Sequence, residues 1–296
     1  MIITDAQELR ALTGSYYQNN DFERIATMVT AVERDVARTV GLTTLDNLTG
    51  EAREAAQVAV AYMAVMRHYR LNDLSHEDAG RKAKIDRENE ARPFEWQLAR
   101  DERAHLEEYY RALDRLADAL RDTEAWQQSP LGKAVGRLIV TGATHLSLLT
   151  GLDNSPWLYL RLVPYMTESQ QFVRQAYGGG FDADMGNSDA AYGDVQTAAA
   201  RAVALGGVAL MGRRTSLQAL PYGLFRLMEQ DGGGNGREQG TLERIDDFLK
   251  HLSREQHYWL NEMRTLRDLL AAKDGDVPAR HLVMPDNERQ QKFMRV

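Results

Sequence analysis

Hydrophobic residues recur every three or four positions over residues 241–273. The series is Leu242, Ile245, Leu249, Leu252, Gln256, Trp259, Met263, Leu266 and Leu270, in which only Gln256 is polar. Charged side chains fill the other faces of the predicted helix. Leucines at this spacing must pack on another helix, because they would otherwise remain in water. The pattern therefore predicts a long helix together with a partner helix.

The same periodicity predicts helices over most of the remaining chain. A short first helix begins at a capping box formed by Thr4 and Gln7 and ends at Gly14. Longer helices are predicted over residues 22–40, 49–68, 93–122, 130–151, 156–163, 164–177 and 195–211. Pro164 separates two of them, because a proline inside a helix removes a hydrogen bond and clashes with the preceding turn.

Four stretches lack this periodicity and are expected to be irregular. Residues 71–92 form a polar excursion with a short hairpin around Gly80, and residues 212–240 form a second excursion. A loop rich in glycine and aspartate follows the helix at 164–177 and runs to about Gly193. The chain after Asp274 reads as an extended tail.

The two halves of the chain contain similar elements in the same order, which suggests an internal repeat. Each half has an apolar helix that ends at glycine, an alanine-rich helix, an irregular excursion and a long helix with a leucine seam. Matching positions include Gly41 with Gly178, Ala59 with Ala202, and Tyr109 with Trp259. Periodicity alone would also align two unrelated amphipathic helices, so both a duplication and a chance likeness remain open.

The predicted fold class is all-α: a helical bundle made of two tandem copies of one helical unit, with irregular arms and a C-terminal tail. The expected domains are residues 1–125 and 126–274, followed by the tail at 275–296.

The long helix at 241–273 would then find its partner inside the molecule. That partner is the alanine-rich helix at 195–211, the matching helix at 93–122, or both. Gln256 stands where Leu106 stands in the first copy. It is therefore expected at the edge of the core or at a contact between copies.

Composition narrows the function classes. The formal net charge of −7 and the pI of about 5.6 argue against a general grip on nucleic acid, which needs clustered Lys and Arg, although a local basic patch stays open. The chain has no cysteine, so it has neither disulfides nor thiolate metal sites. No signal peptide is evident, and no apolar stretch approaches the ~20 residues of a membrane span. We expect synthesis in the cytoplasm and no membrane partner.

Two groups of residues have spacings that suggest metal ligands. Glu102 and His105 form one Glu-x-x-His pair, but a di-iron bundle needs two such pairs and two further glutamates. A surface ion pair is the better interpretation. The acidic loop with Asp182, Asp184 and Asp189 vaguely resembles a calcium loop, yet its spacing differs from an EF-hand and the terminal glutamate is missing. It is expected to be a solvated loop.

Other catalytic patterns are also missing from the sequence. The glycines at 232–236 follow a helix rather than a strand, Gly132-Lys133 lacks the rest of a phosphate-binding loop, and no Gly-x-Ser-x-Gly occurs. Aromatic residues on or beside the long helices are expected to be core or interface anchors: Phe94, Trp96, Tyr109, Tyr110, Phe248, Tyr258 and Trp259. We predict no catalytic, cofactor-binding or metal residue, no cofactor and no enzymatic activity.

Several segments resemble proteins of tailed phages. The run Ile-Ile-Thr-Asp-Ala-Gln-Glu-Leu-Arg at 2–10, Asn-Asn-Asp-Phe-Glu-Arg-Ile at 19–25 and the helix ending Val-Ala-Arg-Thr-Val-Gly at 36–41 are similar to the start of head–tail connector (adaptor) proteins. That likeness covers about the first third of the chain. Over most of its length the sequence also resembles an uncharacterised helical family of phages and prophages. The segments that carry it are Phe-Glu-Trp at 94–96, Ala-Leu-Asp-Arg-Leu at 112–116, Trp-Gln-Gln-Ser-Pro at 126–130, Ser-Pro-Trp at 155–157 and Leu-Val-Pro at 162–164.

The resemblance implies a structural role in the virion neck. Copies would form a ring that docks on the portal and extends the DNA channel towards the tail. The implied partners are the portal, neighbouring neck or tail proteins, other copies of the chain, and DNA that passes without sequence-specific binding. The protein would be made in the host cytoplasm. The alternative is a non-viral soluble helical scaffold or interaction protein without catalytic activity. A bundle enzyme or metal carrier is disfavoured by its missing ligands.

Overall fold

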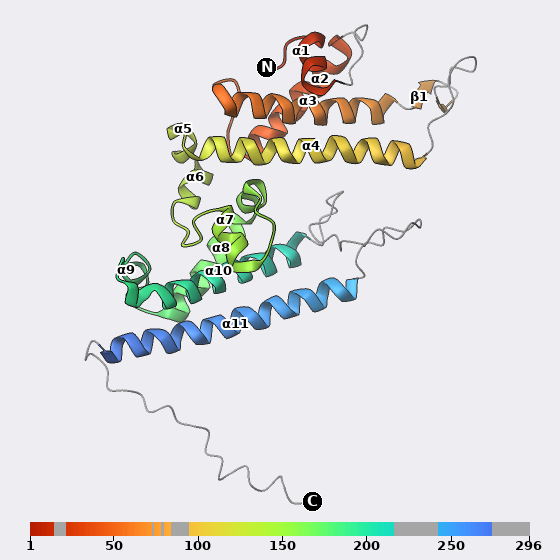
Figure 1. The fold of residues 1–296 in the computed structure, drawn as a ribbon. Helices are drawn as coiled ribbons and strands as arrows, with labels where there is room; N and C mark the ends of the chain where they lie inside the picture. The colour runs from red at the N-terminus through yellow and green to blue at the C-terminus, as the bar shows by residue number, and fades with distance from the viewer. Residues whose placement is uncertain (15–21, 73, 78–79, 84–94, 216–241, 274–296) are drawn as a thin grey trace, which may run out of the picture. The chain divides into compact units, whose positions relative to one another are not determined.

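The computed structural model describes residues 1–14, 22–72, 74–77, 80–83, 95–215 and 242–273, and within them the fold is an all-α helical bundle with one small hairpin (Figure 1). The chain divides into two compact units. The first unit contains residues 1–137, 142–144 and 153–161, and the second contains 138–141, 145–152 and 162–296. The expected all-α class is therefore confirmed.

The first unit is organised around one alanine-rich helix. Its elements are α1 (Ala6–Thr13), α2 (Phe22–Thr39), α3 (Gly50–Asn72), β1 (Leu74–Glu77), β2 (Gly80–Ala83), α4 (Glu95–Arg121), α5 (Glu124–Gln127) and α6 (Pro130–Val135). Helix α3 packs on α1, α2 and α4. Its small side chains, such as Ala56, Ala59 and Ala64, are fully buried. Because alanine adds little bulk, three helices can approach α3 closely and bury the leucine seam of α4.

The second unit is also organised around an alanine-rich helix. Its elements are α9 (Phe181–Met185), a 3-10 turn η1 (Ala190–Tyr192), α10 (Gly193–Thr215) and α11 (Leu242–Lys273). Helices α7 (Ala143–Thr150) and α8 (Pro156–Tyr177) contribute most of their residues to it. Helix α10 lies along α11, which confirms one of the two partners expected for the long leucine seam.

The crossing of α8 over α10 depends on two consecutive glycines. A Cβ on Gly206 would lie 2.3 Å from Ser169 Oγ of α8 and 2.1 Å from Gln256 Nε2 of α11. A Cβ on Gly207 would lie 2.6 Å from Met166 Cγ. Gln256 Nε2 donates to Ser169 Oγ at 3.4 Å. The one polar residue of the α11 seam is thus half-buried at the meeting point of three helices.

Both units pair their alanine-rich helix with their long seamed helix, as α3 with α4 and α10 with α11. An earlier long helix of each unit, α2 and α8, ends at a glycine in the left-handed region, Gly41 with φ 77° and Gly178 with φ 89°. This repeated order agrees with the sequence pattern. The duplication itself stays a prediction.

The excursion after α3 contains the expected hairpin. Strands β1 and β2 pair antiparallel, with Leu74 opposite Ala83 and Glu77 opposite Gly80. The second expected excursion at 212–240 begins later than predicted, because α10 continues to Thr215. Residues 216–241 and the expected tail at 275–296 lie outside the described residues.

Local chemistry corrects the predicted start of α1. The N-cap is Asp5, whose side chain accepts from the backbone N–H of Glu8, rather than Thr4. The backbone N–H of Thr4 donates to the Glu8 carboxylate at 2.9 Å. Asp is as good a capping residue as Thr, and Glu8 additionally satisfies the backbone N–H of the residue just before the cap.

Two predicted helix boundaries were wrong: one break was not predicted, and one was predicted where the helix continues. The helix expected over 130–151 is two short ones, α6 and α7, because the segment between them turns and bends to bury Leu138 and Val140 between two glycines. Conversely, Pro164 lies inside the continuous helix α8. Its ring is exposed, while Leu162, Val163 and Met166 around it are buried. Packing of those neighbours offsets the one hydrogen bond that proline removes.

The observed division also differs from the expected domain boundary between residues 125 and 126. Trp126 is buried in the first unit, where its Nε1–H donates to the carbonyl oxygen of Val40 at 2.8 Å. Helix α6 follows it into the same unit, since Gly132 packs on the Trp126 backbone. Residues up to 137 therefore belong with the first unit.

One helix corrects the expectation that no stretch could cross a membrane. Among the described residues, 190–214 is long and apolar enough by length and composition, with a mean hydropathy of 1.3. However, 78% of the most apolar part of this helix is buried inside the structure. Such burial is what the core helix of a water-exposed bundle also shows.

Candidate functional site

The Glu102–His105 pair is not the surface ion pair that its spacing suggested. Glu102 pairs with Arg70 at 3.2 Å, but His105 is buried against the ring of Tyr62. Its Nδ1 lies 3.0 Å from the carbonyl oxygen of Asp101. Its Nε2 is buried without a hydrogen-bond partner. A histidine in an amphipathic helix can serve as core, and here it packs between α3 and α4.

The acidic loop is an ordered part of the second unit. Asp182 pairs with Arg174, Asp184 accepts from the hydroxyl of Tyr177, and Asp189 caps η1. Each carboxylate therefore has a structural partner. Among the residues that the structure describes, no group of three or more His, Asp and Glu side chains is placed to hold a metal ion.

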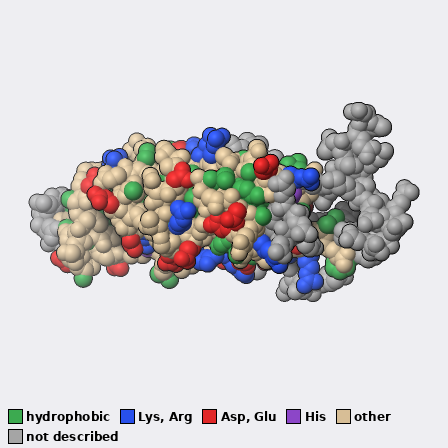
Figure 2. Space-filling model, turned by 90° about the horizontal axis from the view of Figure 1, so that it is seen from above, with side chains coloured by type: hydrophobic (Ala, Val, Ile, Leu, Met, Phe, Trp, Pro, Cys, Tyr) green, Lys and Arg blue, Asp and Glu red, His purple; other side chains and the backbone are tan. Residues whose placement is uncertain are grey.

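The aromatic residues divide between core and surface. Tyr109 is buried, and Trp259 stacks under the guanidinium of Arg201 at 4.5 Å. Trp96, Phe248 and Tyr258 remain exposed, while Phe94 lies outside the described residues. On the face in Figure 2 acidic and basic side chains are interspersed, with hydrophobic side chains among them. That face carries no large patch of side chains of one charge sign.

Two of the segments that carry the phage resemblance meet in the first unit. Asp114 of α4 accepts from Ser155 Oγ at 2.6 Å and from the backbone N–H of Trp157 at 2.9 Å. Ser155 in turn accepts from the backbone N–H of Leu158, so it caps α8. A carboxylate at a helix N-terminus is also favoured by the helix dipole. The indole of Trp157 packs on Tyr110 at 5.0 Å.

Replacing Asp114 with alanine is expected to destabilise the first unit by about 2 kcal/mol, because two donors at the start of α8 lose a charged acceptor. Asp118 lies one turn further along α4 and is exposed, so Asp118→Ala is the matched control and should change stability by less than about 0.5 kcal/mol. Urea unfolding followed by circular dichroism measures both. Equal losses for the two variants would contradict this role for Asp114.

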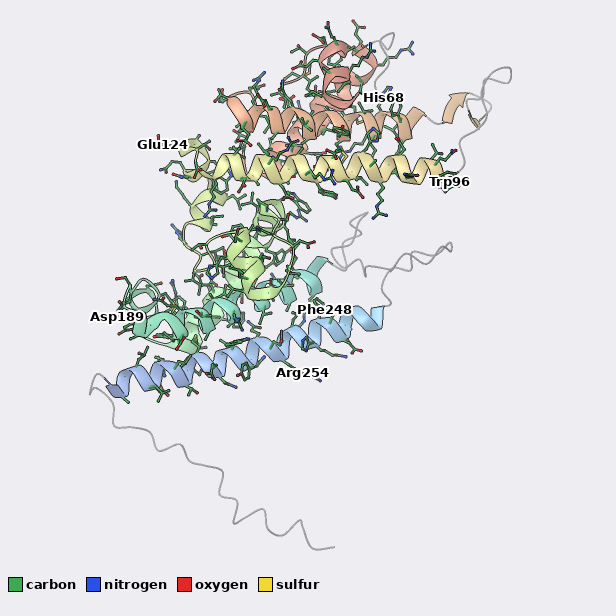
Figure 3. The ribbon with its side chains drawn as sticks, in the orientation of Figure 1. His68, Trp96, Glu124, Asp189, Phe248 and Arg254 are labelled. Carbon is green, nitrogen blue, oxygen red and sulfur yellow. The ribbon has the colours of Figure 1, made fainter. Side chains whose placement is uncertain are left out.

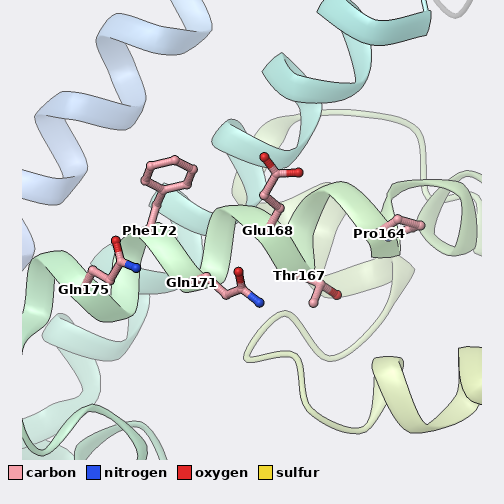
Figure 4. Close-up of a pocket in the computed structure, with 6 residues that line it drawn as sticks. All are labelled: Pro164, Thr167, Glu168, Gln171, Phe172 and Gln175. Carbon is pink, nitrogen blue, oxygen red and sulfur yellow. The ribbon is translucent and has the colours of Figure 1, made fainter.

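An open groove follows one face of α8 in the second unit. It has a volume of about 490 Å³ and is lined by Pro164, Thr167, Glu168, Gln171, Phe172 and Gln175. These residues are three or four positions apart, so they share one face of the helix. In Figure 4 Phe172 and Glu168 point to one edge of this face, and Thr167 and Gln171 point to its other edge. Phe172 is 58% exposed.

Among the described residues that line the groove, the one charged side chain is paired within the second unit. Glu168 forms a bidentate salt bridge with Arg214 in the last turn of α10, with N···O distances of 2.7 and 2.8 Å. The hydrogen bonds from Arg214 hold the pKa of Glu168 below its usual value, and those same bonds raise the pKa of Arg214. The remaining lining residues are uncharged. The groove therefore suits an uncharged side chain that brings some apolar surface.

A second apolar surface lies at the end of the α3–α4 hairpin. Leu71 near the end of α3 and Trp96 and Leu98 in the first turn of α4 are exposed, Trp96 by 61%. Figure 3 shows Trp96 at the beginning of α4, with Glu124 just past its other end. We call these three residues the hairpin tip. The sequence pointed to Trp96 as an anchor, but it placed Leu98 in the buried seam.

Sequence reasoning missed the groove entirely. Its lining mixes threonine, glutamine, glutamate, proline and phenylalanine, and no periodic apolar signal marks such a face. Pro164 was predicted to end a helix, so its neighbours on both sides were not expected to share one helical face.

Comparisons with protein-family models, with curated proteins and with solved structures found no match for this chain.

Proposed function

We propose that this protein is a structural component of the neck of a tailed-phage virion. Its copies form a ring-shaped adaptor that docks on the portal and extends the DNA channel towards the tail. The proposal assigns it no catalytic activity and no cofactor. Its partners are the portal, the next neck or tail protein, and other copies of the chain. It is made in the host cytoplasm and ends in the virion.

One observation carries the proposal: large apolar side chains stay on the surface at several places, although each unit buries a core of its own. Trp96 and Leu98 are exposed at the hairpin tip, and Phe172 is exposed on α8. Exposed apolar surface of this kind is typical of protein contacts. The acidic balance of −7 also suits a conduit that must let DNA slide.

The resemblance to connector proteins supports the same proposal. Its opening segment supplies Ile2, Ile3 and Leu9 to the core of the first unit, and its glycine-ended helix is α2 with Gly41. Asp114, Ser155 and Trp157 come from two segments that carry the separate likeness to the uncharacterised phage family, and they are hydrogen-bonded together. These residues thus lie together in the first unit, whereas the Leu-Val-Pro segment at 162–164 lies in the second.

Solution mass measurement with and without the portal protein of the same genome tests the proposal. We expect a stable complex with the portal that contains several copies of this chain per portal ring. A chain that stays monomeric, does not bind the portal and comes from a genome without portal, capsid and terminase genes would overturn the proposal. That outcome would favour the alternative of a helical scaffold outside any virion.

A further inference from the structure

We draw no further inference here: the strongest candidate, the open groove along the exposed face of α8 beside Phe172, carries none because nothing in the described part of the structure shows what covers that face.

Discussion

Replacing Gly132 with alanine is expected to destabilise the first unit by about 3 kcal/mol or more, at the upper end of the range for overpacked cores. A Cβ at this position would lie 2.1 Å from the carbonyl oxygen of Trp126 and 2.8 Å from the Cα of Gln127. Both are backbone atoms, so no side chain can rotate away. Helix α6 must move off α5, and this movement strains the buried indole that holds Val40 at the end of α2.

The matched control is Gly136→Ala at the end of the same helix. Gly136 has helical φ and ψ of −62° and −12°, and the nearest atom to its added Cβ is 3.6 Å away. This substitution is expected to be neutral or to stabilise by up to about 1 kcal/mol, because it restricts the unfolded chain. Chemical denaturation followed by tryptophan fluorescence and circular dichroism measures both variants. If Gly132→Ala unfolds at the same denaturant concentration as the parent, the close approach of α5 and α6 is wrong.

Replacing Gly206 with alanine is expected to cost the second unit about 1–3 kcal/mol, the usual range for inserting a methyl group into a packed core. The added Cβ would overlap Gln256 Nε2 and Ser169 Oγ, which hydrogen-bond to each other across the helix crossing. Alanine favours an isolated helix over glycine, so propensity alone predicts the opposite sign. The measurement therefore decides between packing and propensity.

A double-mutant cycle locates the cause. Gln256→Ala removes the atoms nearest the new Cβ, so Gly206→Ala should cost about 1 kcal/mol less in the Gln256→Ala background than in the parent. Gly193→Ala is the control on the same helix, since nothing lies within 4 Å of its added Cβ. It should be neutral or stabilising. Purely additive effects of Gly206→Ala and Gln256→Ala would show that the two residues do not touch.

Periodicity predicted the helices that bury one face along their whole length. Helix α2 buries Ile25, Val29 and Val36 as its spacing indicates, and α11 begins and ends within one residue of its predicted bounds. The alanine-rich helices were also predictable, because small residues on most faces suit a helix with neighbours on several sides. Element order could therefore be read from the chain.

Features that depend on distant parts of the chain could not be predicted. Whether Pro164 ends a helix depends on the burial of Leu162 and Met166, and the sequence does not show that burial. Likewise, Gly132 looks like an ordinary helix residue until Trp126 is placed against it. Gln256 was expected at a core edge or a contact between copies, and its position beside Ser169 and Gly206 agrees with a core edge.

The candidate surfaces show the same limit. Aromatic content marked Trp96 as an anchor, but exposure decides whether an anchor serves the core or a partner, and only the fold reveals exposure. Leu98 follows the helical period of the α4 seam and yet is 41% exposed, because it lies at the first turn of the helix. The groove beside Phe172 arises from which face of α8 remains uncovered, and local sequence carries no signal for that.

Electron microscopy of the protein mixed with the portal of its own genome tests the central claim most directly. The account predicts an additional ring of density on the tail-facing end of the portal, coaxial with its channel, with several copies of this chain around the axis. Trp96→Ala should reduce or abolish that ring while leaving the chain folded. Portal particles that look identical with and without this protein, at concentrations well above those used for assembly, would contradict the account.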